Sequence, residues 1–168
     1  MRVAVVGGTG GFGLALAKRL AEAGYEVVVG SRDAERAAAA AATVGVEGAT
    51  NADACRSASL VILATKAEAA VATAAGLRDA IGTTPVLSVA AELTFGADGV
   101  SPTTEATSVA ARIAEVVEGP VVAADERILL GRLVAAEVPG GERVQSRDHG
   151  RVEDVLNARG DRGRLRGR

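Results

Sequence analysis

A glycine-rich loop follows the first apolar run of the chain, and its composition suits the binding of a diphosphate. The apolar residues 3–6 lead into residues 7–13, which read GGTGGFG, and an amphipathic stretch follows over residues 14–23. Gly8 can take the positive φ of a sharp turn, Gly10 leaves room for a diphosphate, and Gly13 lets the helix lie close to the strand. The helix would direct its unpaired N–H groups and positive dipole end at the phosphates. The predicted pyrophosphate-binding residues are Gly8, Thr9, Gly10, Gly11, Phe12 and Gly13. The alternative is a glycine-rich turn without a ligand.

The end of the second expected strand predicts which dinucleotide is bound. An NAD-binding fold carries an Asp or Glu here that bonds the ribose hydroxyls. This chain has Gly30-Ser31-Arg32 instead. Ser31 offers a hydroxyl donor, Arg32 offers a fork that matches phosphate geometry, and Arg36 follows one helical turn later. These residues favour a 2′-phosphate, and therefore NADP(H) over NAD, although a solvated surface charge is the alternative for Arg32.

Alternating apolar runs and helical segments predict the fold that positions these residues. Strands are expected at 3–6, 26–29, 44–47, 60–64, 85–89 and 120–123, and helices at 11–23, 34–43, 52–57, 66–81 and 103–117. This alternation predicts an α/β fold with a doubly wound parallel sheet, a Rossmann-type domain. Asp33 is the expected N-cap of the second helix and Thr103 or Thr104 that of the last, whereas Gly24 should end the first. The six alanines at 37–42 are expected to pack a helix against the sheet.

Composition restricts the partners of the chain. Its 168 residues carry a formal net charge of −2, which gives no overall attraction to nucleic acid or to an anionic membrane. The single cysteine, Cys55, and the single histidine, His149, predict neither an internal disulfide nor a clustered metal site. The longest apolar stretch, 60–77, is interrupted by Lys66 and Glu68, so no membrane span is expected. A cytoplasmic location is the expectation.

The last part of the chain differs in composition from the rest. Residues 127–168 hold 10 arginines, no lysine and 6 acidic residues. Apolar residues become sparse there, so an Arg/Gly-rich tail is expected, disordered beyond about residue 140. A nucleic-acid-binding arm is the alternative, but no aromatic side chains are interleaved to stack on bases. The predicted organisation is a dinucleotide-binding domain over 1–124 and an atypical tail over 125–168.

Three segments together resemble a known family. Residues 7–10 (GGTG), 30–33 (GSRD) and 107–111 (TSVAA) are similar to those of the NADPH-dependent reductases of coenzyme F420. The resemblance covers about residues 1–124. It implies hydride transfer between NADP(H) and a deazaflavin, and a chain that can form a homodimer. It also implies that Thr9, Ser31, Arg32 and Arg36 surround the 2′-phosphate. Ala64 and Thr65, at the end of the fourth expected strand, complete the predicted cofactor-binding residues.

No catalytic residue can be assigned from the sequence. No nucleophile–base pair, carboxylate pair or metal cluster is evident, and hydride transfer between two cofactors needs none, because the protein supplies alignment. A short-chain reductase would need a Tyr and a Lys four residues apart, and the single tyrosine, Tyr25, is followed by Val29 at that spacing. Two alternatives stay open. One is a catalytically incomplete NADP-binding module, and the other is a dehydrogenase of small carbonyl compounds that uses Lys66. Cys55, beside Arg56, is read as a packing residue rather than a reactive thiol.

Overall fold

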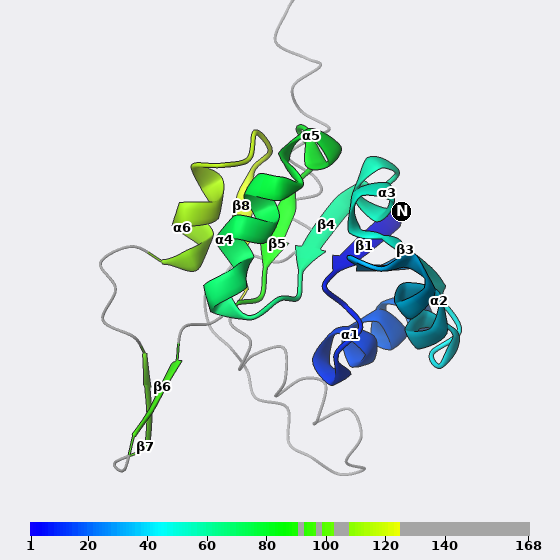
Figure 1. Ribbon diagram of the computed structural model, residues 1–168, viewed down its shortest axis with the longest axis horizontal. Coiled ribbons are helices and arrows are strands. Elements are labelled where there is room, and N and C mark those ends of the chain that lie inside the picture. The colour runs from blue at the N-terminus through cyan, green and yellow to red at the C-terminus, as the bar shows by residue number, and fades with distance from the viewer. Residues whose placement is uncertain (91–92, 97–98, 103–107, 125–168) are drawn as a thin grey trace, which may run out of the picture. The chain divides into compact units, whose positions relative to one another are not determined.

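A six-stranded parallel sheet forms the centre of the described structure (Figure 1). The computed structural model describes residues 1–90, 93–96, 99–102 and 108–124. The sheet order is β3-β2-β1-β4-β5-β8, which is the doubly wound order, so the predicted fold class is confirmed. Its strands are β1 (Arg2–Val6), β2 (Glu26–Ser31), β3 (Glu47–Thr50), β4 (Leu60–Leu63), β5 (Val86–Ser88) and β8 (Val121–Ala123).

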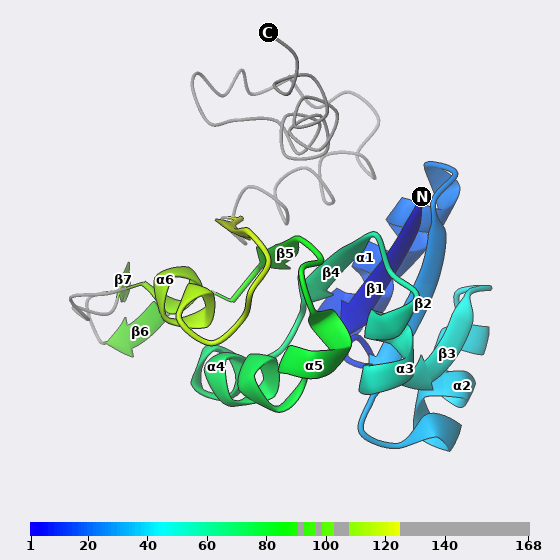
Figure 2. The same cartoon turned by 90° about the horizontal axis from the view of Figure 1, so that it is seen from above.

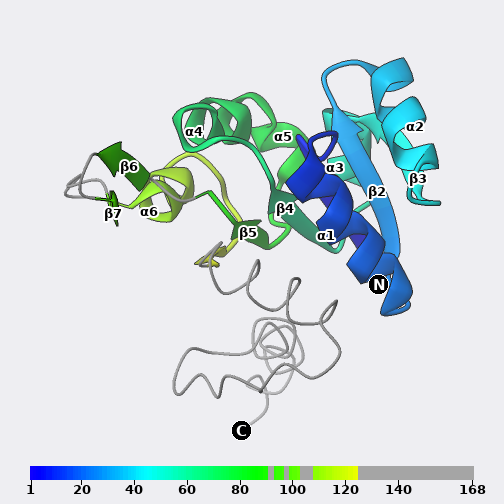
Figure 3. The same cartoon turned by 90° about the horizontal axis from the view of Figure 1, so that it is seen from below.

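Helices cover both faces of the sheet because the buried strands are apolar on both sides. Val3 and Val5 pack on the face covered by α1 (Gly11–Glu22) and α2 (Ala34–Ala42). Ala4 and Val6 face the other layer, which contains α3 (Asn51–Arg56), α4 (Ala67–Gly76), α5 (Arg78–Ile81) and α6 (Val109–Ala114). Figure 2 shows α1 on the far side of β1 from α4 and α5, and in Figure 3 α1 lies in front of the sheet.

Several local predictions are confirmed around α1 and α2. The Asp33 carboxylate accepts a hydrogen bond from the Arg36 N–H at 2.8 Å, as the N-cap of α2. Gly24 takes φ 86° just beyond the end of α1. Ala37 in the alanine run is fully buried, and a β-carbon on Gly48 of β3 would stand 2.4 Å from its carbonyl oxygen. Only small residues on both sides allow α2 to lie this close to β3.

The third strand was predicted in the wrong place. It spans Glu47–Thr50 rather than residues 44–47. Residues 44–46 instead continue the turn that ends α2, in which Val44 and Val46 donate to the Ala41 carbonyl and Gly45 takes φ 72°. The actual strand reads EGAT and lies at the sheet edge, so no apolar run marks it.

Three further differences concern residues 66–117. The helix predicted over 66–81 is divided at Leu77 into α4 and α5. The last helix, predicted over 103–117, begins at Val109 with Ser108 as its described N-cap, and Thr103 and Thr104 lie outside the described residues. An antiparallel pair, β6 (Leu93–Gly96) and β7 (Gly99–Pro102), was not predicted.

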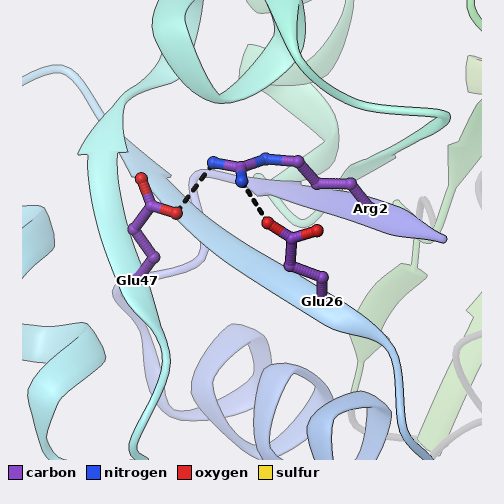
Figure 4. A network of polar contacts seen from close by, with 3 residues as sticks. All are labelled: Arg2, Glu26 and Glu47. Atoms are coloured by element: carbon purple, nitrogen blue, oxygen red, sulfur yellow. Dashed lines mark hydrogen bonds and ion pairs between the residues drawn. The ribbon is translucent and has the colours of Figure 1, made fainter.

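A charged network joins the amino ends of the first three strands (Figure 4). The guanidinium of Arg2, on β1, pairs with the carboxylate of Glu26 on β2. Its other terminal nitrogen lies 2.7 Å from a carboxylate oxygen of Glu47 on β3. Parallel strands bring their amino ends to one edge, so this network lies at the edge opposite the glycine loop.

The predicted tail, 125–168, lies outside the described residues, as does His149. The domain boundary between residues 124 and 125 therefore stays a prediction. Among the helices that the structure describes, none is long and apolar enough to cross a membrane.

Candidate dinucleotide-binding site

The glycine loop lies where the chain reverses direction across the sheet. β1 is flanked by β2 on one side and β4 on the other, and all three strands are parallel. Their carboxyl ends therefore open at one edge, and the chain leaves this edge in opposite directions after β1 and after β4. Ligands of open α/β sheets bind in the crevice at such a switch point.

The turn out of β1 is made by Gly7 rather than by Gly8. Gly7 has φ 69°, which corrects the prediction that Gly8 takes the positive φ. Gly8 is required for a different reason, since its β-carbon would stand 2.7 Å from the Val5 carbonyl oxygen and 2.8 Å from Val5 Cγ1. The loop therefore doubles back closely on β1, and the strand itself leaves no room for a side chain at Gly8.

The start of α1 is open and has no side-chain cap. Gly10 is the N-cap residue, and it makes no side-chain capping bond. Its carbonyl accepts from Leu14 N–H at 2.9 Å, so the N–H groups of residues 11–13 precede the first intrahelical bond. Among the described residues, no heavy atom lies within 4 Å of a β-carbon built on Gly10 or Gly11. These features leave room and free donors for an anion. Thr9 is half-buried in the same loop, and the half-buried side chain of Phe12 packs against the core.

Two exposed arginines follow β2, Arg32 directly after the strand and Arg36 in the first turn of α2. Ser31 is 8% exposed, and its hydroxyl accepts from the Asp33 N–H at 3.4 Å. Within the described part of the chain, no hydrogen bond or ion pair engages the guanidinium groups of Arg32 and Arg36. Asp33, the acid next to Arg32 in sequence, uses a carboxylate oxygen to cap α2. The site therefore offers cationic donors for a phosphate.

The residues after β4 complete this edge. The Ala64 N–H donates to the Val6 carbonyl at 2.9 Å, which extends the pairing of β4 with β1. The methyl of Thr65 lies 2.5 Å from the position of a β-carbon on Gly7, so Thr65 packs directly on the loop. The Thr65 hydroxyl is buried, and no described residue forms a hydrogen bond with it. Lys66 follows as the exposed N-cap residue of α4.

Asn51 belongs to this site, although the sequence did not reveal it. Its Oδ1 accepts a hydrogen bond from the Gly7 N–H at 3.3 Å. A β-carbon on Gly30 would stand 2.6 Å from the same oxygen. Gly30 in turn accepts a bond from the Gly8 N–H at 3.2 Å. The misplacement of the third strand left Asn51 in an expected connection, with no reason to place it beside the loop.

The described residues suit binding more than acid–base chemistry. Burial raises the pKa of the Cys55 thiol to about 11 against the opposing effect of Arg56, so Cys55 is a packing residue as predicted. No group of three or more potential metal ligands occurs in the ranges that the structure describes. A dinucleotide held here would meet backbone donors, hydroxyls and guanidinium groups. The individual ligand contacts of the predicted site residues stay predictions.

Comparison with known proteins identifies the relatives of this domain. The model of the family described as NADP oxidoreductase, coenzyme F420-dependent, matches residues 2–92. An F420-dependent NADP reductase of Methanothermobacter thermautotrophicus is 49% identical over 90 residues, which covers 48% of this chain and 39% of the relative. The protein of the same name from Methanothermobacter marburgensis is 48% identical and is covered to 40%.

Solved structures show the same similarity over more of the chain. An Arthrobacter protein, provisionally assigned as an F420-dependent NADP reductase, aligns with a TM-score of 0.60 and 29% identity over 72% of this chain and 60% of its own. An imine reductase of Streptomyces aurantiacus aligns with a TM-score of 0.55 and 26% identity over 73% of this chain and 40% of its own. The matched part spans about two fifths of the length of the curated relatives. The family model matches more than half of the 168 residues of this chain. The chain therefore belongs to the family of coenzyme F420-dependent NADP oxidoreductases.

Proposed function

We propose that residues 1–124 form a domain that binds NADP(H) at the carboxyl edge of β1, β2 and β4. The observation that carries this proposal is the open, uncapped start of α1 beside β2. A helix start with free N–H groups and a positive dipole end attracts a diphosphate. The loop residues Gly8, Thr9, Gly10, Gly11, Phe12 and Gly13 would hold it, with Ala64 and Thr65 across the crevice.

The preference for NADP(H) over NAD rests on charge at the end of β2. Arg32 and Arg36 are exposed and carry no ion pair among the described residues, and Ser31 presents a hydroxyl at the strand end. A 2′-phosphate would gain charge-assisted hydrogen bonds from the guanidinium groups. The acid expected of an NAD site is absent from Gly30-Ser31-Arg32, and the Asp33 carboxylate is engaged at the N-cap of α2.

We infer that the full activity is hydride transfer between NADP(H) and coenzyme F420. Both Methanothermobacter relatives are named F420-dependent NADP reductases. When bound, the nicotinamide would supply the hydride chemistry. The chain would bind and orient the dinucleotide and would exclude water from it. The described residues contain no cluster of potential metal ligands, and their one thiol is buried and protonated. A cytoplasmic location and a homodimer remain predictions.

The alternative is an NADP-binding module that lacks the reductase activity. It is favoured by one observation, that the matched part covers only 39% and 40% of the two curated relatives. Mixing the full chain with NADPH and oxidised F420, and following the absorbance of both, separates the two proposals. Oxidation of NADPH matched by reduction of F420 supports the reductase. Saturable NADPH binding without turnover supports the module, and no binding of NADPH refutes both.

A further inference from the structure

We propose that Asn51 is a positioning residue for the diphosphate-binding loop, which it holds through the backbone of Gly7. This inference rests on the proposed NADP(H) site and assigns a role to a residue outside the glycine motif. Asn51 is the first residue of α3, and it reaches the loop from the far side of β2. Its Oδ1 accepts the Gly7 N–H at 3.3 Å.

Close neighbours restrict the conformation of Gly7. Gly7 has φ 69°, a conformation that is rarely populated except by glycine, and it must be held there by its surroundings. The Thr65 methyl closes one side, at 2.5 Å from a β-carbon position on Gly7. Asn51 binds the N–H of the same residue. Gly7 is therefore fixed between a methyl contact and a hydrogen bond.

Gly30 makes the approach of Asn51 possible. A β-carbon at Gly30 would stand 2.6 Å from Asn51 Oδ1 and 3.2 Å from Asn51 Cα, so any side chain there displaces the amide. The Gly30 carbonyl also accepts the Gly8 N–H at 3.2 Å. The end of β2 and the start of α3 thus anchor two successive N–H groups of the loop. This leaves the later groups, from Thr9 onward, to face a ligand.

Asn51 would act on the diphosphate without contacting it. Its hydrogen bond is to Gly7, which precedes the open residues Gly10 and Gly11. Removal of the amide would leave the Gly7 N–H without its partner and let the loop move. Affinity for NADP should fall about fivefold, the factor for one hydrogen bond of ordinary strength. Affinity for the adenosine 2′-phosphate group should not change.

The test measures two ligands with the full chain. NADP reaches both the loop and the end of β2, whereas adenosine 2′-monophosphate reaches only the latter. Asn51→Ala should weaken the binding of NADP about fivefold and leave that of adenosine 2′-monophosphate within about twofold. Arg56→Ala is the matched control, because its exposed guanidinium lies at the other end of α3 and pairs with Asp53 there. It should change neither affinity.

Equal losses for both ligands in Asn51→Ala, or no loss for NADP, would overturn the positioning role. Failure of the wild-type chain to bind either ligand would instead refute the proposed site, and it would remove the functional role of Asn51 with it. Binding of adenosine 2′-monophosphate that is insensitive to Arg32→Ala would refute only the assignment of the 2′-phosphate. The three failures are therefore distinguishable.

A double-mutant cycle tests the contact itself without a ligand. Gly30→Ala should lower the midpoint of thermal unfolding, because its methyl meets the Asn51 amide. In the Asn51→Ala background the obstructing oxygen is gone, so the same substitution should lower the midpoint by less than half as much. Equal shifts in the two backgrounds would contradict the geometry, because independent sites add.

Discussion

The backbone of Gly8 occupies the space in which a side chain on Gly13 would begin. A β-carbon on Gly13 would stand 2.5 Å from Gly8 Cα and 2.6 Å from the Gly8 carbonyl oxygen. Both atoms belong to the backbone, so they cannot rotate away. The first turn of α1 is therefore pressed against the loop that precedes it, and the close approach expected at Gly13 is to this loop rather than to the strand.

A matched pair of substitutions isolates this contact. Ala is a better helix former than Gly by about 1 kcal/mol, so Gly11→Ala, which enters open space, should keep or raise the free energy of unfolding. Gly13→Ala should lower it by about 1–3 kcal/mol, the usual cost of overpacking. Urea unfolding of the ligand-free protein measures both. A Gly13→Ala protein as stable as Gly11→Ala would show that the loop yields.

Gly10→Val tests the loop as the diphosphate site. No described atom lies within 4 Å of a β-carbon at Gly10, so the folded protein should tolerate the branched side chain. The same side chain would fill the space that a diphosphate needs beside the start of α1. We expect the thermal midpoint to change little and NADP binding to be lost in calorimetric titration. Normal NADP binding by this variant would mean that the loop has been assigned wrongly.

Arg32→Ala tests the preference for NADP. A hydrogen bond to a charged group contributes roughly 1.5–3 kcal/mol, so the affinity for NADP should fall about ten- to a hundredfold. The affinity for NAD, which has no 2′-phosphate, should hardly change. Arg78→Ala is the control, because that exposed guanidinium pairs with Glu118 on the surface. Equal losses for NADP and NAD in the Arg32 variant would refute the 2′-phosphate role.

The sequence predicted the parts of the fold that strong local patterns control. The buried apolar runs of β1, β2, β4 and β5 and the cap at Asp33 were all found where expected. The edge strand β3 was misplaced because its four residues, EGAT, pack against α2 through small groups rather than through an apolar pattern. Its position depends on contacts from distant parts of the chain.

The sequence predicted those parts of the candidate site that a local motif marks. The glycine loop and the polar end of β2 are each one continuous segment, so their residue types and spacing could be read directly from the sequence. The roles of Gly7 and Gly8 could not be distinguished, because the turn and the close approach to Val5 appear only in three dimensions. Asn51 lies 44 residues from Gly7, and nothing local marks that contact.

Cys55 offers a test of the buried core through chemical reactivity. The thiolate is the nucleophile, and burial raises the pKa of the Cys55 thiol to about 11. The folded protein should therefore react slowly with an aromatic disulfide reagent at pH 8, and the protein unfolded in urea should react rapidly. The absorbance of the released aromatic thiolate measures both rates. Rapid reaction of the folded protein would show that α3 opens readily.

The same thiol predicts how stability depends on pH. The folded pKa of about 11 lies above the ordinary value of 9.0, and burial is the main cause, against the weaker opposing effect of Arg56. Between pH 9 and 11 the unfolded chain loses this proton while the folded chain keeps it. The free energy of unfolding should therefore fall as pH rises through this window, by up to about 3 kcal/mol, and show no such effect below it.

Cys55→Ala removes the titrating group but leaves the other ionisable side chains, so urea unfolding of both proteins at pH 7 and pH 10.5 isolates the thiol. The loss between these two pH values should be smaller in Cys55→Ala, and an equal loss in the two proteins would show that the folded thiol ionises as readily as the unfolded one.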